Sequence, residues 1–278
     1  LERVTEFPPT SVSAAVESAR ANGGPWIDNH FHMDADSDLK VIVAAAEAAG
    51  VVAMVCVGTD VASSRHCLDR STQSGRIWAT AGVHPHDAAG GIEGLREIFI
   101  EAADEQLRLV AVGECGLDFH YDHSPRAEQR RAFSEQIQLA HEFALPLVVH
   151  TRSAWDETFE ILDAEGVPDR TVFHCFTGGP TEATGALERG ALLSISGIVT
   201  FKSADDVRSA VEMTPLESLM VETDSPFLTP VPHRGRPNEP AMVRLIGEAV
   251  AKVKGLDVAT VAEATTANAS AFYGLPLT

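Results

Sequence analysis

The chain has 278 residues, of which 45% are hydrophobic and 22% charged, and its 40 acidic against 21 basic residues give a formal net charge of −19. This composition is typical of globular proteins and excludes collagen-like, coiled-coil and disordered chains. The acidity excludes a surface built for non-specific binding of duplex DNA, so local cations or bound metal ions must hold any nucleic-acid substrate. No apolar run approaches the roughly 20 residues of a membrane span.

The elements expected in chain order are short apolar runs that alternate with longer amphipathic stretches. We expect strands at residues 26–29, 51–57, 77–81, 109–112, 147–149, 171–173, 191–196 and 219–221. Segments with helical periodicity lie between them, for example residues 126–144 and 153–165. Gly50, Gly166 and Gly190 stand where helices are expected to end.

This alternation predicts a parallel sheet with helices on its outside. Eight repeats in about 250 residues favour a single-domain (β/α)8 barrel of the TIM type. We place the barrel at residues 26–278, after an N-terminal extension at residues 1–25. The alternative is an open Rossmann-like sheet, but no G-x-G-x-x-G follows any expected strand.

Polar side chains follow the apolar runs where the expected strands end. The first run continues into His30 and His32, which are two residues apart and therefore face the same side of an extended chain. Later runs end in Glu114, His150, His174 and Asp224. In barrel enzymes the chemistry lies at the carboxyl ends of the strands.

Carboxylates and imidazoles gathered at one end of a barrel would be costly through desolvation and repulsion, and a pair of divalent cations would remove that cost. Mixed imidazole and carboxylate ligands suit zinc, manganese, iron or nickel, whereas carboxylate and water alone suit magnesium better. The pattern therefore predicts a metal site, with isolated capping or core polar residues as the alternative.

Six motifs carry a resemblance to a known family. They are D-N-H-F-H-M-D at residues 28–34, G-V-H-P-H at 82–86, G-E-C-G-L-D-F at 113–119, H-T-R at 150–152, H-C-F-T-G at 174–178 and E-T-D-S-P-F-L-T-P-V-P-H-R-G-R-P-N-E-P at 222–240. From about Ile27 onward the chain closely resembles the TatD-type deoxyribonucleases of the amidohydrolase superfamily. Asn29 and Phe31 replace commoner small residues of the family's first motif, and residues 1–25 have no counterpart.

The resemblance implies a hydrolase with two divalent metal ions (Mg, Zn or Mn), for which DNA, as single strands or frayed ends, is the expected substrate. The implied metal ligands are His30, His32, Glu114, His150, His174 and Asp224. Glu114 takes the bridging position and would thereby take part in catalysis. In many members of the superfamily a carbamylated lysine stands there instead.

Three helper roles follow for residues near the implied metals. Asp224 is expected to orient the attacking water and accept its proton, with a role as ligand alone as the alternative. His84 is a candidate to bind or protonate a phosphate oxygen. Arg152, Lys202 and Arg234 are candidates for binding the substrate's phosphates, and Arg152 offers a planar guanidinium fork.

Two other classes of function remain open at this stage. The same two-metal barrel attacks carbonyl groups as readily as phosphorus, so an ester or amide such as aminoacyl-tRNA is an alternative substrate. A metal-binding protein without activity is the other alternative, and the intact set of ligand types argues against it. The four cysteines form no C-x-x-C pair, so we expect free thiols and a cytoplasmic location.

Overall fold

The computed structural model describes residues 24–276, in which strands and helices alternate along the chain. The strands are β1 (Trp26–Phe31), β2 (Val51–Val57), β3 (Ile77–Ala81), β4 (Leu109–Asp118), β5 (Leu147–Arg152), β6 (Thr171–Phe173), β7 (Leu192–Ile195) and β8 (Leu219–Val221). The α-helices are α2 (Leu39–Ala48), α3 (Val61–Gln73), α4 (Leu95–Asp104), α5 (Arg126–Phe143), α6 (Trp155–Glu165), α7 (Pro180–Glu188), α8 (Asp205–Met213), α9 (Val243–Lys254) and α10 (Val258–Tyr273). Of the expected N-terminal extension, only Gly24 and Pro25 fall within the described residues.

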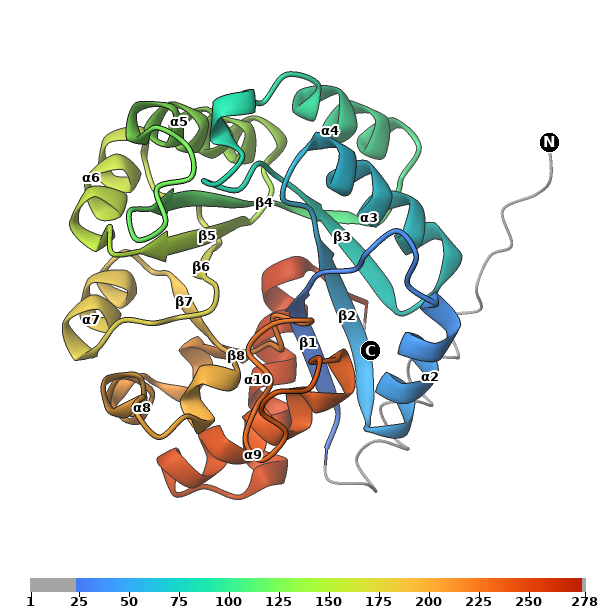
Figure 1. The fold of residues 1–278 in the computed structure, drawn as a ribbon, viewed down its shortest axis with the longest axis vertical. Coiled ribbons are helices and arrows are strands. Elements are labelled where there is room, and N and C mark those ends of the chain that lie inside the picture. The colour runs from blue at the N-terminus through green and yellow to red at the C-terminus, as the bar shows by residue number, and fades with distance from the viewer. Residues whose placement is uncertain (1–23, 277–278) are drawn as a thin grey trace.

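The strands form one parallel sheet in the order β1-β2-β3-β4-β5-β6-β7-β8, with the helices arranged around it (Figure 1). Short 3-10 helices lie in the connections: η1 (Ala88–Gly90), η2 (Gly197–Thr200), η3 (Leu216–Ser218) and η4 (Pro240–Met242). This arrangement confirms the predicted (β/α)8 barrel and excludes the open sheet. Among residues 24–276, no helix is both long and apolar enough to cross a membrane.

The barrel closes between its first and last strands. Phe31 and Ser225 form a parallel bridge, and the amide of His32 donates to the Ser225 carbonyl at 2.8 Å. The amide of Asp224 in turn donates to the carbonyl of His30 at 2.9 Å. The hydrogen bonds that close the barrel therefore also fix the backbone of three predicted metal ligands.

The expected strand positions agree with the structure, but three strands run further than expected. Strand β4 continues six residues past Val112 to Asp118, while β1 ends at Phe31 and β5 at Arg152. Two glycines allow the extension of β4. A Cβ atom on Gly116 would lie 1.9 Å from the carbonyl oxygen of His150, and one on Gly113 would lie 2.6 Å from that of Val148. Both glycines also have positive φ angles, which side chains disfavour.

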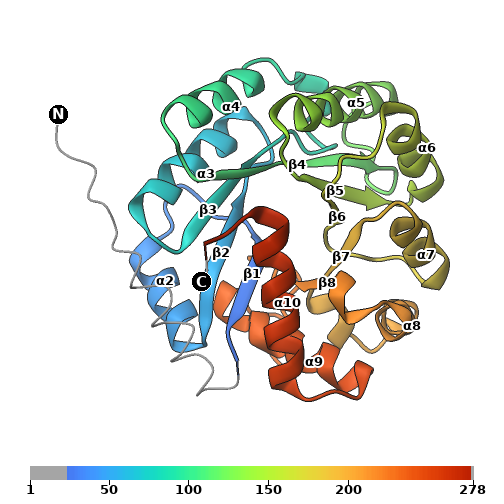
Figure 2. The same ribbon diagram turned by 180° about the vertical axis from the view of Figure 1, so that it is seen from behind.

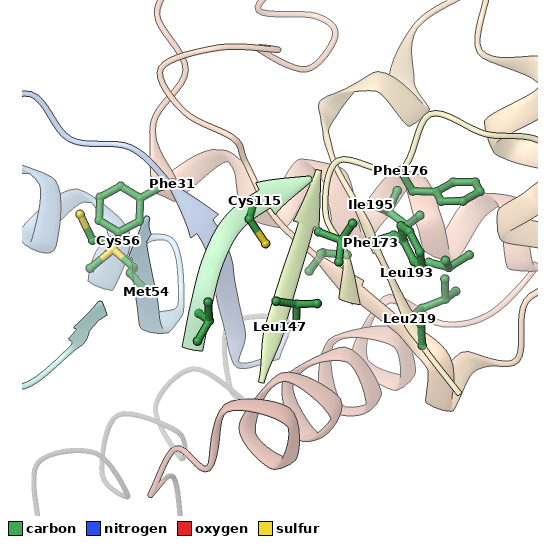
Figure 3. Packing of buried hydrophobic residues seen from close by; sticks show 14 of the residues in the cluster. Phe31, Met54, Cys56, Cys115, Leu147, Phe173, Phe176, Leu193, Ile195 and Leu219 are labelled. Atoms are coloured by element: carbon green, nitrogen blue, oxygen red, sulfur yellow. The ribbon is translucent and has the colours of Figure 1, made fainter. Parts of the chain in front are cut away.

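Two clusters of apolar side chains fill the protein. The larger one lies between the strands and the helices outside them, and Figure 3 shows Phe31, Met54 and Cys56 gathered near one another in it. The smaller cluster joins strand residues such as Ile27 to Phe272 of α10. Helix α10 packs against β1 and β8 and crosses the barrel in the view of Figure 2. Neither apolar cluster includes the polar side chains described next.

Candidate metal centre

The structure brings all six predicted metal ligands, and His84, into one cluster at the carboxyl ends of the strands. The members are His30 on β1, His32 just after it, His84 after β3, Glu114 on β4, His150 on β5, His174 after β6 and Asp224 after β8. His32 and His150 are half-buried, and the other five side chains are buried. Residues up to 194 positions apart in the sequence thus share one small volume, as expected for barrel chemistry.

Glu114 lies at the centre of the cluster. Its Oε2 atom is 2.7 Å from His30 Nε2 and 3.2 Å from His174 Nε2, and its Oε1 atom is 3.1 Å from His84 Nε2. One carboxylate therefore contacts histidines from both halves of the predicted ligand set. This is the position that a carboxylate shared by two ions would occupy.

Irregular backbone aims two of these side chains. The pairing register of β4 with β5 shifts between Val112 and Cys115, next to Glu114, and that of β1 with β2 shifts between Asp28 and Phe31, next to His30. Such irregularities re-aim side chains and are common beside active sites.

Two non-glycine residues at the rim adopt left-handed backbone conformations. The φ angle of Asp224 is +55°, and that of Cys175, which directly follows His174, is +42°. Residues held in this region store backbone strain, which concentrates at functional sites. The Asp224 carboxylate lies 3.4 Å from His32 Nε2 and 3.9 Å from His30 Nε2.

Hydrogen bonds at Nδ1 orient the rings of two histidines that are predicted metal ligands. His32 Nδ1 lies 3.2 Å from the carbonyl oxygen of Val57, and His174 Nδ1 lies 3.3 Å from Glu222 Oε1. Because both oxygens only accept, each Nδ1 carries the proton and, in the neutral ring, each Nε2 presents a lone pair to the cluster. Metal-binding histidines are held in this way.

The His150 and His174 rings face each other through two ring nitrogens. His150 Nδ1 lies 3.2 Å from His174 Nε2, while His150 Nε2 points to Asp118 Oδ2 at 3.4 Å. With the outer nitrogens next to carboxylates, the inner lone pairs repel each other unless a proton or cation lies between them. Two nitrogens bound at roughly 2.1 Å to one ion would have a similar separation.

Several buried polar atoms of the cluster make no well-aligned hydrogen bond among residues 24–276, although some of them lie close to an oppositely charged or polar atom, as Glu114 Oε2 does to His30 Nε2. They are His30 Nδ1 and Nε2, Glu114 Oε2 and His150 Nε2. Leaving such atoms unsatisfied is costly, so buried polar atoms without partners call for a ligand or ion. Three triplets have donor atoms within 4.8 Å of one another: His30 with His32 and Glu114, His30 with His174 and Glu222, and His84 with Glu114 and His150. The donor set therefore fits a metal centre, and its mixture of imidazole and carboxylate suits zinc or manganese.

Burial and neighbouring charges shift the pKa values of the two carboxylates downward overall. Burial has the largest effect on Glu114 and would raise its pKa, but the adjacent imidazoles, led by His174 and His84, hold that pKa well below its usual range. Burial also acts to raise the pKa of Asp224, but the neighbouring imidazoles, led by His32, together lower it. Both groups are therefore carboxylates at neutral pH.

The pKa values of the histidines shift in both directions. Burial lowers the pKa of His32, but the contact with Asp224 and the charge of Glu114 outweigh it and raise the pKa to about 9. The pKa of His174 also rises to about 9, because the charges of Glu114 and Glu222 outweigh burial. Burial lowers the pKa values of His30 and His84, so these rings are neutral.

Sequence reasoning assigned no role to two acidic residues that support the cluster. Glu222 is fully buried, and besides His174 it accepts hydrogen bonds from the Cys175 amide and the Ser194 hydroxyl. Asp118 is buried beside His150 and His86, at 3.4 and 3.0 Å. Both residues lie inside the motifs quoted above, and this position was the only sign in the sequence that they matter. Which residues they contact is determined by the fold.

The predicted substrate-binding cations lie outside the cluster. The Arg152 guanidinium stacks on Tyr121 at 4.7 Å, and that of Arg234 on Phe201 at 3.9 Å, whereas Lys202 is an exposed residue after η2. Within the described range, no hydrogen bond or ion pair links these three side chains to the seven clustered residues. Their role in binding substrate stays a prediction.

A (β/α)8 barrel with histidines and carboxylates at the carboxyl ends of its strands is the architecture of a metal-dependent hydrolase. The family model described as TatD related DNase matches residues 27–274, so the chain belongs to the TatD family of metal-dependent hydrolases. It is 39% identical over 251 residues to "Uncharacterized metal-dependent hydrolase YcfH" from Escherichia coli K12, covering 87% of this chain and 93% of that protein.

Two further relatives agree with this assignment. The chain is 36% identical to "3'-5' ssDNA/RNA exonuclease TatD" from Salmonella typhimurium, over 85% of this chain and 93% of that protein. Its fold matches the crystal structure of the TatD homologue YjjV from Escherichia coli K12 with a TM-score of 0.84 at 25% identity, over 90% and 98% of the two chains. The prediction of a metal-dependent hydrolase of this family is confirmed.

Metal binding should release protons from the cluster at neutral pH. His32 and His174 have pKa values of about 9 in the metal-free protein, so both carry a proton at pH 7 that a ligating lone pair must lose. We expect up to two protons released per chain and an apparent affinity that rises with pH and levels off near pH 9. Zinc titration calorimetry in two buffers of different ionisation enthalpy measures the number released. Release of no protons at pH 7 would contradict this assignment.

Removing the negative charge from Glu222 should weaken the metal centre without removing a proposed ligand. Glu222→Gln keeps the size of the side chain but takes away the acceptor charge that holds the Nδ1 proton of His174. Changes of this kind cost roughly 10- to 100-fold in metal affinity. Zinc titration against a competing chelator gives the affinity, and Glu239→Gln, at an exposed position of the same loop, is the control. Equal affinities for the two variants would exclude the supporting role of Glu222.

Proposed function

We propose that this chain is a two-metal nuclease that trims the ends of single-stranded or frayed DNA. The observation that carries the proposal is the Glu114 carboxylate, which contacts His30 and His174 with one oxygen and His84 with the other. The printed names of the Salmonella and Klebsiella relatives, 3'-5' ssDNA/RNA exonucleases, support a nucleic-acid substrate and attack at strand ends.

Within this proposal the cluster divides into two ligand sets that share Glu114. His30, His32 and Asp224 would hold one ion, and His150 and His174 the other. When bound, such ions lower the pKa of water and neutralise charge on a phosphodiester. The protein's own contribution is to hold seven side chains in place and to keep the carboxylates ionised.

Asp224 is the proposed general base. Its carboxylate is ionised at neutral pH, and its backbone is fixed by the hydrogen bond to the His30 carbonyl. A proton taken from the attacking water would pass to a carboxylate oxygen of Asp224. The loop after β8 therefore has to hold this side chain close to the proposed ions.

His84 is proposed as a hydrogen-bond donor to the substrate's phosphate. Its Nδ1 atom accepts from the His86 amide at 3.1 Å, and burial keeps the ring neutral, so its Nε2 atom carries the proton. That N–H faces Glu114 Oε1 and is unsuited to act as a metal ligand. A phosphate oxygen near Glu114 could accept the same hydrogen bond.

Local cations must offset the chain's net charge of −19 for DNA to bind. Arg152, at the end of β5 two residues after His150, is the best placed of the three predicted residues, and Lys202 and Arg234 lie on the loops that follow β7 and β8. A cytoplasmic location is also part of the proposal, supported by the four free cysteines.

A panel of substrates tests the proposed function. Metal-loaded protein should release nucleotides from labelled single-stranded DNA faster than from blunt duplex DNA, and only with a divalent ion present. RNA and aminoacyl-tRNA complete the panel, because an ester or amide is the alternative substrate for the same donor set. Hydrolysis of aminoacyl-tRNA with intact DNA would overturn the nuclease proposal in favour of that alternative.

The variant Asp224→Asn tests whether Asp224 acts as a general base or only as a metal ligand. The amide keeps an oxygen that can bind a metal but loses the basicity, so a base role predicts a loss of roughly two to four orders of magnitude in turnover. Single-turnover DNA cleavage across a metal titration is the measurement. Recovery to near the wild-type rate at saturating metal would show that Asp224 is a ligand alone. Arg152→Ala provides the contrast, because loss of a phosphate contact should raise KM without changing metal content.

A further inference from the structure

Phe227 presents an exposed aromatic ring beside the candidate metal centre. Its side chain is 60% exposed, and its ring centroid lies 6.2 Å from that of His32, at an interplanar angle of 62°. Single exposed apolar residues are common on protein surfaces, so exposure alone does not indicate a binding site. The position is informative, because the neighbouring groups of the cluster are imidazoles and carboxylates.

The backbone of Phe227 is held firmly. Its amide donates to the Asp224 carbonyl at 2.9 Å, and its carbonyl accepts from the buried Asn238 side chain at 2.7 Å. The same Asn238 amide group donates to the Thr223 carbonyl at 2.8 Å. Phe227 is therefore fixed to the segment that carries Asp224, and binding a flat ligand would order little of this loop.

Tyr121, the other exposed aromatic residue near the cluster, differs in its surroundings. It is 50% exposed, but its ring lies parallel to His123 at 5.5 Å, and the Arg152 guanidinium lies 4.7 Å from its centre. Within residues 24–276, the contact with His32 is the single ring contact recorded for Phe227. Phe227 thus has aromatic surface available to a ligand.

We propose that Phe227 is a stacking platform for one nucleobase next to the phosphodiester that is cleaved. This inference rests on the proposed nuclease function. In that proposal the ions held by the cluster would bind the phosphate, and Phe227 lies beside the cluster. Every base offers a π-face, so such a platform accepts all sequences. A base within a duplex is already stacked on its neighbours, so the platform favours single-stranded ends.

The test compares Phe227→Leu with Phe227→Trp on a single-stranded DNA oligonucleotide. Leucine removes the aromatic face and tryptophan keeps it. We expect Phe227→Leu to raise KM about 10- to 100-fold, the worth of one base stacked on an aromatic ring, with a smaller change in kcat. Phe227→Trp should stay within about threefold of the wild type. Val231→Ala removes another exposed apolar side chain, 47% exposed, from the same loop and is the matched control.

Abasic substrates identify the base involved. A series of oligonucleotides, each with one abasic position among the last three nucleotides, should contain one member on which wild type and Phe227→Leu have equal KM. An unchanged KM for Phe227→Leu on the intact strand, or the same loss on every abasic strand, would overturn the stacking role.

A binding measurement separates this inference from the nuclease proposal. An oligonucleotide with 2-aminopurine at the identified end position, or at each of the three in turn, should lose fluorescence on binding to the wild type but not to Phe227→Leu. If no oligonucleotide is cleaved by the metal-loaded wild type, the nuclease proposal fails by itself. Absence of quenching by the wild type refutes the platform whether or not cleavage occurs.

Discussion

The buried negative charge of Glu114 is the constraint on which the rest of the site depends. A carboxylate at the mouth of an apolar barrel is stable only if positive charge or donors approach it closely. Here imidazoles from β1 and from the segments after β3 and β6 contact its two oxygens. Without metal, protons on His32 and His174 supply charge, and ions would replace them. The site is therefore a set of negative groups that requires cations.

Closure of the barrel and assembly of the site are one structural event. The hydrogen bonds between residues 30–32 and 224–225 join the end of the first strand to the segment that follows the last, and they also bring His30 and His32 beside Asp224. The apolar clusters elsewhere keep the strands in register without the polar residues.

The sequence was sufficient to predict the barrel and the types of residue that gather at the carboxyl ends of its strands, because both leave local patterns. Apolar runs mark strands, and His30 and His32 are two residues apart, on one face. Glu222 left no such pattern: its meaning depends on His174, 48 residues away, and on Ser194, both of which only the fold brings near. The extension of β4 beyond Val112 could not be predicted for the same reason. Glycine is disfavoured inside strands, and the need for Gly113 and Gly116 depends on the close approach of β5.

The negative net charge of the chain opposes binding of the proposed nucleic-acid substrate. Groups at the carboxyl ends of the strands would therefore have to supply the attraction. A net charge of −19 repels nucleic acid at long range, so affinity has to arise from short-range contacts. In the proposed function, ions held by the cluster would act on one phosphate and Arg152 on a neighbouring one. Stacking on Phe227 adds attraction that salt screens little, because it involves no charge on the protein. Such a site would gain little affinity from the regularly spaced phosphates of a duplex. It would gain most from a strand end whose bases are unstacked.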